Sequence, residues 1–180
     1  MAGKAKSIPK NQPIMNSTQT FEENQITPPV KILYTGKTRT IGGRDGGSVQ
    51  SDDGRLNVKL SIPGSPGAGT NPEQLFAAGW SACFIGAMKI AAGKMKVRIP
   101  PDAAIDAEVD LCLAEAGYFL QARLNVALPG LDHEVVRALV KAAHQTCPYS
   151  KATRGNLNVT INIMPADSAT RLDSTGTLPA

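Results

Sequence analysis

The feature that most constrains the fold is a nearly uncharged run, NPEQLFAAGWSACFIGAMK, at residues 71–89. It opens with a helix start signal. Asn71 can cap free backbone amides, Pro72 suits the first helical position, and the carboxylate of Glu73 suits the positive end of a helix dipole. We therefore predict a long helix that ends near Gly93.

The predicted helix is apolar around most of its circumference, which indicates burial on several sides. Gly79 and Gly86 are poor helix formers, and their presence suggests that another backbone approaches the helix closely. Because glycines, a serine and charged ends interrupt the run, we do not expect it to reach the roughly 18 to 20 apolar residues of a membrane helix.

Segments on both sides of this helix alternate between polar and apolar residues. In 55–62, for example, every second residue is apolar, the period of a half-buried antiparallel strand. The predicted strands are 30–41, 48–51, 55–62, 104–114, 119–128 and 157–163. A second helix at 132–147 separates the last two, and Pro148 ends it because a residue before proline disfavours helix. This order predicts an α+β fold with antiparallel hairpins.

The ends of the chain differ from its centre. Residues 1–29 are polar and lack periodicity, and residues 165–180 are similar. We predict one folded domain at 30–164, long enough for a hydrophobic core, between an N-terminal tail or arm and a C-terminal tail.

Composition argues against several classes of function. The net charge is +4, the basic residues are scattered and aromatic residues make up only 4% of the chain, so nucleic-acid binding is not expected. The first twenty residues lack the apolar segment of a secretory signal. The expected location is the cytoplasm, without a membrane partner.

The three cysteines, Cys83, Cys112 and Cys147, are too few and too widely spaced for a disulfide scaffold. No CxxC motif occurs, and His133 and His144 do not supply the closely spaced pairs of a zinc site. No metal is expected, and the pattern favours a separate role for each thiol.

Local pattern alone makes none of the thiols reactive. Cys112 shares a strand face with acidic residues, which raise a thiol pKa, so we expect it to be a bystander. Cys147, at a helix C-terminus, is a poor first nucleophile and is either a resolving thiol or a packed cap. Cys83 lies within the apolar helix, where burial raises the pKa, so it is a core residue unless a cation approaches from elsewhere. Arg44, in the glycine-rich turn GGRDGG, would by itself be expected to be solvated.

Three motifs taken together resemble a known family. GGRDG at 42–46, GTNPEQLFAAG with ACFIGA at 69–87, and TCPYSKATRGN at 146–156 occur in the order found in the organic hydroperoxide resistance (Ohr) branch of the OsmC/Ohr peroxidase family. The resemblance spans about residues 30–164. Trp80 is a departure, because the family usually has tyrosine there.

The resemblance implies roles for four residues. Cys83 would be the peroxidatic cysteine and Cys147 the resolving cysteine. Arg44 would be the cation that keeps Cys83 ionised, and Glu73 would hold that arginine by an ion pair. Arginine suits this role because it does not lose its proton and can bridge a sulfur and a carboxylate.

The resemblance also implies an assembly and a substrate class. The assembly is an intertwined homodimer, in which antiparallel sheets wrap around central helices and the sites lie at the subunit interface. The implied substrates are organic and fatty-acid hydroperoxides, the implied reductant is a dihydrolipoyl group or another dithiol, and no cofactor is used. Apolar side chains near the thiol would favour an alkyl peroxide over hydrogen peroxide. They are Phe76, Trp80, Phe84 and Met88.

Two functional alternatives and one geometric question remain open. The alternatives are an OsmC-type peroxidase of broader specificity and a non-enzymatic redox sensor or hydrophobic-ligand binder on the same fold. The question concerns Glu73 and Cys83, which lie about 15 Å apart along a straight helix and so cannot touch. Either the chain bends near Gly79, Arg44 spans the distance, or Glu73 comes from the other subunit.

Overall fold

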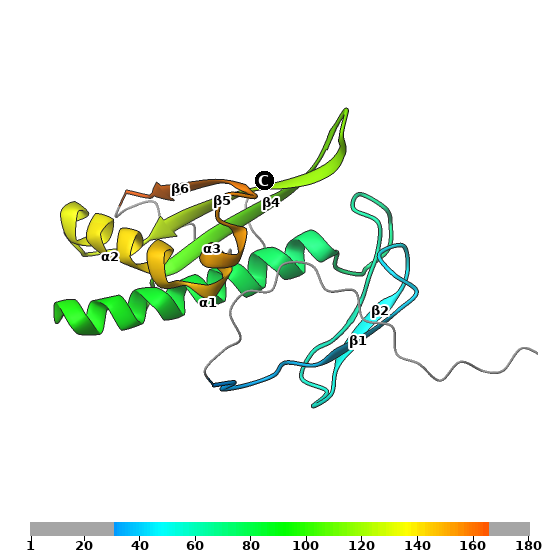
Figure 1. Ribbon diagram of the computed structural model, residues 1–180, viewed down its shortest axis with the longest axis horizontal. Helices are drawn as coiled ribbons and strands as arrows, with labels where there is room; N and C mark the ends of the chain where they lie inside the picture. The colour runs from blue at the N-terminus through cyan, green and yellow to red at the C-terminus, as the bar shows by residue number, and fades with distance from the viewer. Residues whose placement is uncertain (1–30, 166–180) are drawn as a thin grey trace, which may run out of the picture. The chain divides into compact units, whose positions relative to one another are not determined.

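The computed structural model describes residues 31–165, and every helix and strand in it belongs to the unit that begins at Lys37 (Figure 1). The predicted N-terminal tail at 1–29 lies outside the described residues. So does the predicted C-terminal tail, apart from Pro165.

A small antiparallel sheet opens this unit. Its strands are β1 (Thr38–Ile41), β2 (Ser48–Ser51) and β3 (Asn57–Lys59), in the order β1-β2-β3. β2 has the predicted bounds, whereas β1 and β3 are shorter than predicted because the ladder pairs only four residues of β1 and three of β3. The turn between β1 and β2 requires glycine. Gly42 and Gly43 have positive φ angles of 77° and 68°, and a Cβ on Gly47 would meet the carbonyl oxygen of Ile41.

The long helix α1 (Pro72–Met95) starts as predicted. The Asn71 side chain accepts a hydrogen bond from the backbone N–H of Gln74 at 2.8 Å, and proline occupies the first turn. The helix continues past Gly93 and ends at Lys96, whose φ of 57° is left-handed and whose N–H bonds to the carbonyls of the last turn. Gly93 therefore lies within the last turn and does not terminate the helix.

Burial of α1 is one-sided, contrary to the prediction. Its buried residues are Trp80, Phe84, Ala87, Met88, Ala91 and Ala92. Ala78, Ala82, Gly86 and Ile90 are exposed, and nothing lies within 4 Å of a Cβ added at Gly86. The close approach at Gly79 comes from the side chain of Tyr149 and not from a backbone. Within residues 31–165, one apolar face of this helix is therefore left exposed.

The glycines and the serine that interrupt the apolar run lie within α1, and the helix is nevertheless apolar on average. The helix has 24 residues and a mean hydropathy of 1.5 over an 18-residue window, enough by length and composition to cross a membrane. The core helix of a soluble protein meets the same criteria. Because α1 packs against α2, α3 and β4, we assign it as a core helix.

A second sheet contains β4 (Ala104–Ala114), β5 (Gly117–Ala127) and β6 (Asn158–Ile163), in the order β4-β5-β6. β4 and β5 form the predicted antiparallel hairpin, in register from Ala104↔Ala127 to Ala114↔Gly117. β6 instead pairs parallel to β5, so the purely antiparallel prediction was wrong at this strand. Two helices connect β5 to β6, and such a crossover returns the chain in the direction of the first strand.

Those two helices are α2 (His133–Thr146) and α3 (Pro148–Thr153). The Asp132 side chain caps α2 by accepting from the Glu134 N–H at 2.9 Å. The sequence did not predict α3, because Pro148 was interpreted only as a helix stop. Proline also suits the first position of a new helix, which is the position it takes here.

The core lies between the second sheet and the helices on one of its faces (Figure 1). Phe84 and Met88 of α1, Leu124 and Val126 of β5, and Leu139 of α2 are all completely buried in it. Helices segregated to one face of a sheet define an α+β architecture, which confirms the predicted fold class.

Replacing Leu139 with alanine should lower the free energy of unfolding by about 2–5 kcal/mol, because a fully buried leucine leaves a cavity. Lys141→Ala, on the exposed side of the same helix, is the control and should change it by less than about 0.5 kcal/mol. Urea unfolding at one protein concentration, followed by the fluorescence of the single tryptophan, measures both. Equal stability of the two variants would contradict the described packing of α2.

Candidate active site

Two sulfur atoms meet where α1 contacts the junction of α2 and α3. The Sγ atoms of Cys83 and Cys147 lie 3.5 Å apart, although the residues are 64 positions apart in sequence. Both cysteines are free thiols, with Cys83 partly exposed and Cys147 completely buried. A disulfide requires a separation of about 2.05 Å, so a small movement suffices to join them.

Backbone geometry at the junction positions Cys147. Its φ and ψ of −59° and 125° break the helix, so α2 ends before it and α3 begins after it. Its N–H still bonds to the Ala143 carbonyl at 2.8 Å, and its carbonyl accepts from the Lys151 N–H at 3.0 Å. The residue is therefore fixed by both helices while its side chain meets α1.

The environment of Cys83 disfavours ionisation. Burial raises the pKa of this thiol. The neighbouring Cys147 raises it further, mainly through the hydrogen bond between the two sulfurs and to a smaller extent through charge repulsion. The backbone N–H of Tyr149 acts in the opposite direction and lowers the pKa. In this arrangement the protonated thiol is the favoured form at neutral pH.

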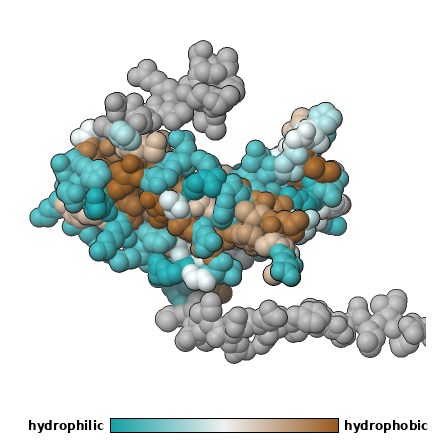
Figure 2. All heavy atoms as spheres, turned by 90° about the horizontal axis from the view of Figure 1, so that it is seen from above, coloured by the Kyte–Doolittle hydropathy of each residue, from teal (hydrophilic) through white to brown (hydrophobic). Residues whose placement is uncertain are grey.

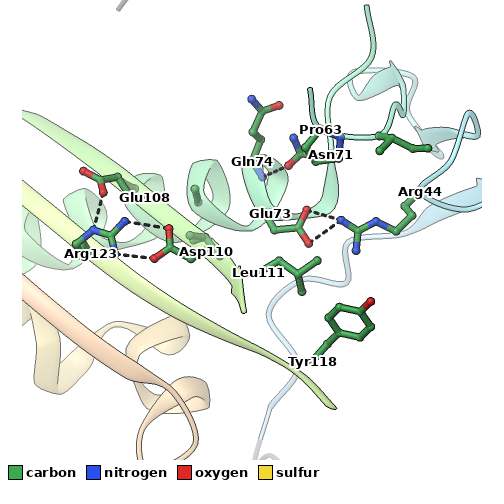
Figure 3. A pocket seen from close by; sticks show the side chains of 14 residues that line it. Arg44, Pro63, Asn71, Glu73, Gln74, Glu108, Asp110, Leu111, Tyr118 and Arg123 are labelled. Atoms are coloured by element: carbon green, nitrogen blue, oxygen red, sulfur yellow. Dashed lines mark hydrogen bonds and ion pairs between the residues drawn. The ribbon is translucent and has the colours of Figure 1, made fainter. Parts of the chain in front are cut away.

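Arg44 and Glu73 form an ion pair within one chain. The Arg44 Nη2 donates to both carboxylate oxygens of Glu73 at 3.1 Å (Figure 3). The arginine comes from the glycine turn of the first sheet, and the glutamate comes from the first turn of α1. Their side chains are 38% and 13% exposed, so solvent still reaches the guanidinium.

This ion pair lies on one side of a groove of about 930 Å³. On the other side, Arg123 donates to the two oxygens of Asp110 at 2.6 and 2.9 Å (Figure 3). These hydrogen bonds lower the pKa of Asp110 to about 2. Asp110 belongs to β4, the edge strand of its sheet, and residues 107–111 of this strand line the groove. Neither Cys83 nor Cys147 lines this groove.

Arg44 does not contact Cys83 in this structure. Among the described residues, no hydrogen bond or ion pair joins them, and Arg44 does not influence the pKa of the thiol. Helix α1 runs without interruption through Gly79, so no bend brings Glu73 to Cys83. Two of the three geometric explanations therefore remain: either Arg44 spans the distance after a rearrangement, or the ion pair serves another subunit.

Three of the four predicted pocket residues offer no surface to a ligand here. Trp80, Phe84 and Met88 are completely buried in the core, and only Phe76 is partly exposed. Phe76 packs edge-on against Trp80 with ring centroids 5.5 Å apart, and its centroid lies 6.0 Å from that of Tyr149. Trp80, Phe84 and Met88 therefore belong to the core against which Cys83 packs and do not form an open pocket wall.

Sequence reasoning missed the contribution of α3. The Trp80 Nε1 donates to the Oγ of Ser150 at 3.2 Å, and the Tyr149 hydroxyl would lie 2.8 Å from a Cβ at Gly79. The motif that contains both residues was identified, but its helical conformation was not. The proline after Cys147 was the available signal.

Neither the third thiol nor a metal-binding cluster adjoins the two sulfurs. Cys112 pairs in register with Phe119 on the β4–β5 hairpin, away from the helix junction. Within residues 31–165, no group of three or more His, Cys, Asp or Glu side chains could hold a metal ion.

Comparison with known proteins identifies relatives that all belong to one family. The family model described as OsmC-like protein matches residues 64–162. The organic hydroperoxide resistance protein of Xanthomonas axonopodis pv. citri is 48% identical over 142 residues, which cover 77% of this chain and 99% of the relative. OhrA of Bacillus subtilis is 42% identical over 138 residues, covering 73% of this chain and 96% of the relative.

Solved structures agree with these sequence matches. The crystal structure of OhrB from Bacillus subtilis has a TM-score of 0.70 and 41% identity, covering 74% of this chain and all of that one. A structure from Legionella pneumophila, described as an organic hydroperoxide resistance protein OsmC, has a TM-score of 0.69 and 40% identity. It covers 75% of this chain and all of that one.

Proposed function

Because the chain belongs to the OsmC/Ohr family, with organic hydroperoxide resistance proteins among its relatives, we propose that it is a thiol peroxidase that reduces organic hydroperoxides to alcohols. The observation that carries this proposal is the 3.5 Å separation of the Cys83 and Cys147 sulfurs. It supports a cycle in which one sulfur is oxidised by substrate and the other closes a disulfide.

The proposed cycle has three balanced steps. The Cys83 thiolate attacks the terminal peroxide oxygen, the O–O bond breaks, and the alkoxide takes up a proton and leaves as the alcohol. The Cys147 thiol then attacks the Cys83 sulfenic acid, forming the disulfide and releasing water. A dithiol, such as a dihydrolipoyl group, reduces the disulfide by thiol–disulfide exchange and is itself oxidised to a disulfide.

Exposure supports this division of roles. Cys83 is partly exposed, so a peroxide can approach it, whereas Cys147 is completely buried. Cys147 lies at the junction of α2 and α3, where it meets Cys83 from inside the core. Cys83 is therefore the proposed first nucleophile and Cys147 the proposed resolving thiol.

Ionising Cys83 requires a cation, because its surroundings raise its pKa. We assign this role to Arg44, with Glu73 holding the guanidinium in place. Since the ion pair forms at the start of α1, about 15 Å from the cysteine of the same helix, we infer that it completes the site of a second copy of the chain.

The uncovered surfaces of one chain support a homodimer. The exposed face of α1 contains small residues at Ala78, Ala82 and Gly86, which permit close packing of another element. Leu113 and Tyr118, on the β4–β5 hairpin, are 69% and 76% exposed. Figure 2 shows hydrophobic areas on the molecular surface among hydrophilic ones. In the part of the chain that the structure describes, β4 is an edge strand, and its outer backbone donors and acceptors could pair with another strand.

Apolar surroundings support an organic substrate. Phe76 and Ile85 are partly buried and pack against the same core as Cys83. Such surroundings bind an alkyl peroxide more favourably than hydrogen peroxide, and the binding free energy differs by about 0.8 kcal/mol for each CH₂ group buried.

We expect the enzyme to act in the cytoplasm, without a metal or haem.

Substitution of each cysteine separates the roles. Cys83→Ser should lose all peroxidase activity, because no other thiol is placed to attack. The Cys147→Ser variant should complete one oxidation and then stall or over-oxidise, because the sulfenic acid on Cys83 has no second thiol with which to form a disulfide. Cys112→Ser is the control and should remain near wild type. Mass spectrometry after one equivalent of organic peroxide maps the bonds, and a disulfide that involves Cys112 would contradict the assignment.

Substrate comparison separates the proposed activity from its alternatives. The rate constant with tert-butyl or cumene hydroperoxide should exceed that with hydrogen peroxide by at least about tenfold, the gain from burying two CH₂ groups. Comparable rates would favour a peroxidase of broader specificity. A single oxidation that no dithiol reverses would favour a redox sensor or ligand binder.

Replacing Arg44 with alanine should reduce the peroxide rate at pH 7 on the order of 30-fold, the change expected if thiolate falls from most of the population to a few per cent. Without the cation, the raised pKa of Cys83 means that the rate should keep rising at alkaline pH, where the wild type has levelled off. Arg55→Ala, in a neighbouring turn and 90% exposed, is the control.

Mixed dimers test whether Arg44 acts on the second subunit. A dimer of one Arg44→Ala subunit and one Cys83→Ser subunit retains one intact site if the arginine acts across the interface, and should show about half of wild-type activity. The same dimer has no intact site if Arg44 acts within its own chain. An inactive mixed dimer would therefore exclude the proposed arrangement between subunits.

A further inference from the structure

Helix α3 is held on one face of α1. The α1 residues Phe76, Gly79, Trp80 and Cys83 are spaced three or four positions apart, so they share this face. The Tyr149 ring lies against Gly79, Ser150 bonds to Trp80, and Cys147 meets Cys83. The contact between the two cysteines is therefore one of three contacts that hold this region against the same face of α1.

The Trp80–Ser150 bond is the polar contact of this set. It measures 3.2 Å, and both residues are 0% exposed. An indole N–H is a donor only, and a buried donor without an acceptor is costly, so removing the Ser150 hydroxyl would destabilise this contact. Among the residues from 31 to 165, this is the only hydrogen bond between a side chain of α1 and a side chain of α3.

The Trp80–Ser150 bond lies close in sequence to both cysteines. Trp80 precedes Cys83 by three residues, and Ser150 follows Cys147 by three residues. Cys147 makes no side-chain capping hydrogen bond to α3, so the start of this six-residue helix depends on contacts with its neighbours. Because α3 starts at Cys147, a change in how α3 packs on α1 loosens one of the two helices that hold the Cys147 sulfur near Cys83.

We propose that the Trp80–Ser150 hydrogen bond is a positioning device that holds the Cys147 sulfur against Cys83 and so sets the rate of disulfide formation. This inference rests on the proposed peroxidase cycle for its oxidant. The step it controls is the attack of the Cys147 thiol on the Cys83 sulfenic acid, which forms the S–S bond and releases water. Attack of Cys83 on the peroxide does not require the bond.

Positioning matters because the sulfurs must close from 3.5 Å to about 2.05 Å. When a helix holds one reacting atom beside another, the reaction gains a high effective concentration. Without the bond, α3 can adopt other positions on α1, in which the Cys147 sulfur lies farther from the Cys83 sulfur. The sulfenic acid then persists, and excess peroxide converts it to the sulfinic acid.

The test compares Ser150→Ala with wild type after mixing with one equivalent of cumene hydroperoxide. Rapid quenching and mass spectrometry follow the sulfenic acid and the disulfide separately. We expect the first oxidation to keep its wild-type rate and disulfide formation to slow about tenfold, the size of one buried hydrogen bond. We also expect more sulfinic acid in excess peroxide.

Thr153→Val is the matched control. Thr153 is a buried hydroxyl residue of the same helix, but its hydroxyl bonds only to the carbonyls of Tyr149 and Ser150 within α3. It should resolve at the wild-type rate. Ser150→Thr keeps a hydroxyl and should recover most of the lost rate. If Ser150→Ala does not fold, Trp80→Phe removes the donor instead and should show the same slow resolution.

Exchange with oxidised dithiothreitol tests the inference without peroxide. Oxidation of the two thiols is then matched by reduction of dithiothreitol, and the equilibrium gives the effective concentration of one sulfur at the other. Ser150→Ala should lower it about tenfold. A wild-type value, or a wild-type rate of resolution, overturns the inference. If peroxide fails to oxidise the wild type, the proposed function fails and this exchange measurement still decides the role of the bond.

Discussion

The meeting of α1 with the α2–α3 junction is the contact on which the proposed chemistry depends. An extended residue followed by Pro148 breaks one helical path into two, and the break turns Cys147 toward the middle of α1. Neither sulfur is presented by a loop. Both are held by helices in a shared core, which keeps them 3.5 Å apart without a covalent bond.

The same packing creates an electrostatic problem. Burial raises the pKa of the Cys83 thiol, so the thiolate that must attack the peroxide is disfavoured. An arginine held by Glu73 solves this problem only if it reaches the sulfur, and within one chain it does not. The exposed face of α1 and the edge position of β4, taken over residues 31–165, support our proposal that a single chain is half of the functional unit.

Local chemistry was predictable where a few residues determine it. Asn71, Pro72 and Glu73 define the start of α1, and the period-two pattern locates β4 and β5, because capping and strand burial depend on short-range order. The direction of β6 was not predictable from its own residues, since it is set by the crossover before it. The 3.5 Å contact of the sulfurs joins positions 64 residues apart, and only the family resemblance indicated it.

Because of the crossover, the proposed disulfide would also change the stability of the fold. Joining Cys83 to Cys147 closes a loop across 64 positions that contains β4, β5 and α2. A loop of this length restricts the unfolded chain by about 4 kcal/mol of conformational entropy at room temperature. Each turnover would therefore alternate between a tethered chain that resists unfolding and proteolysis and an open chain that is more vulnerable. The supply of reductant would then set how long the protein survives as well as how fast it works.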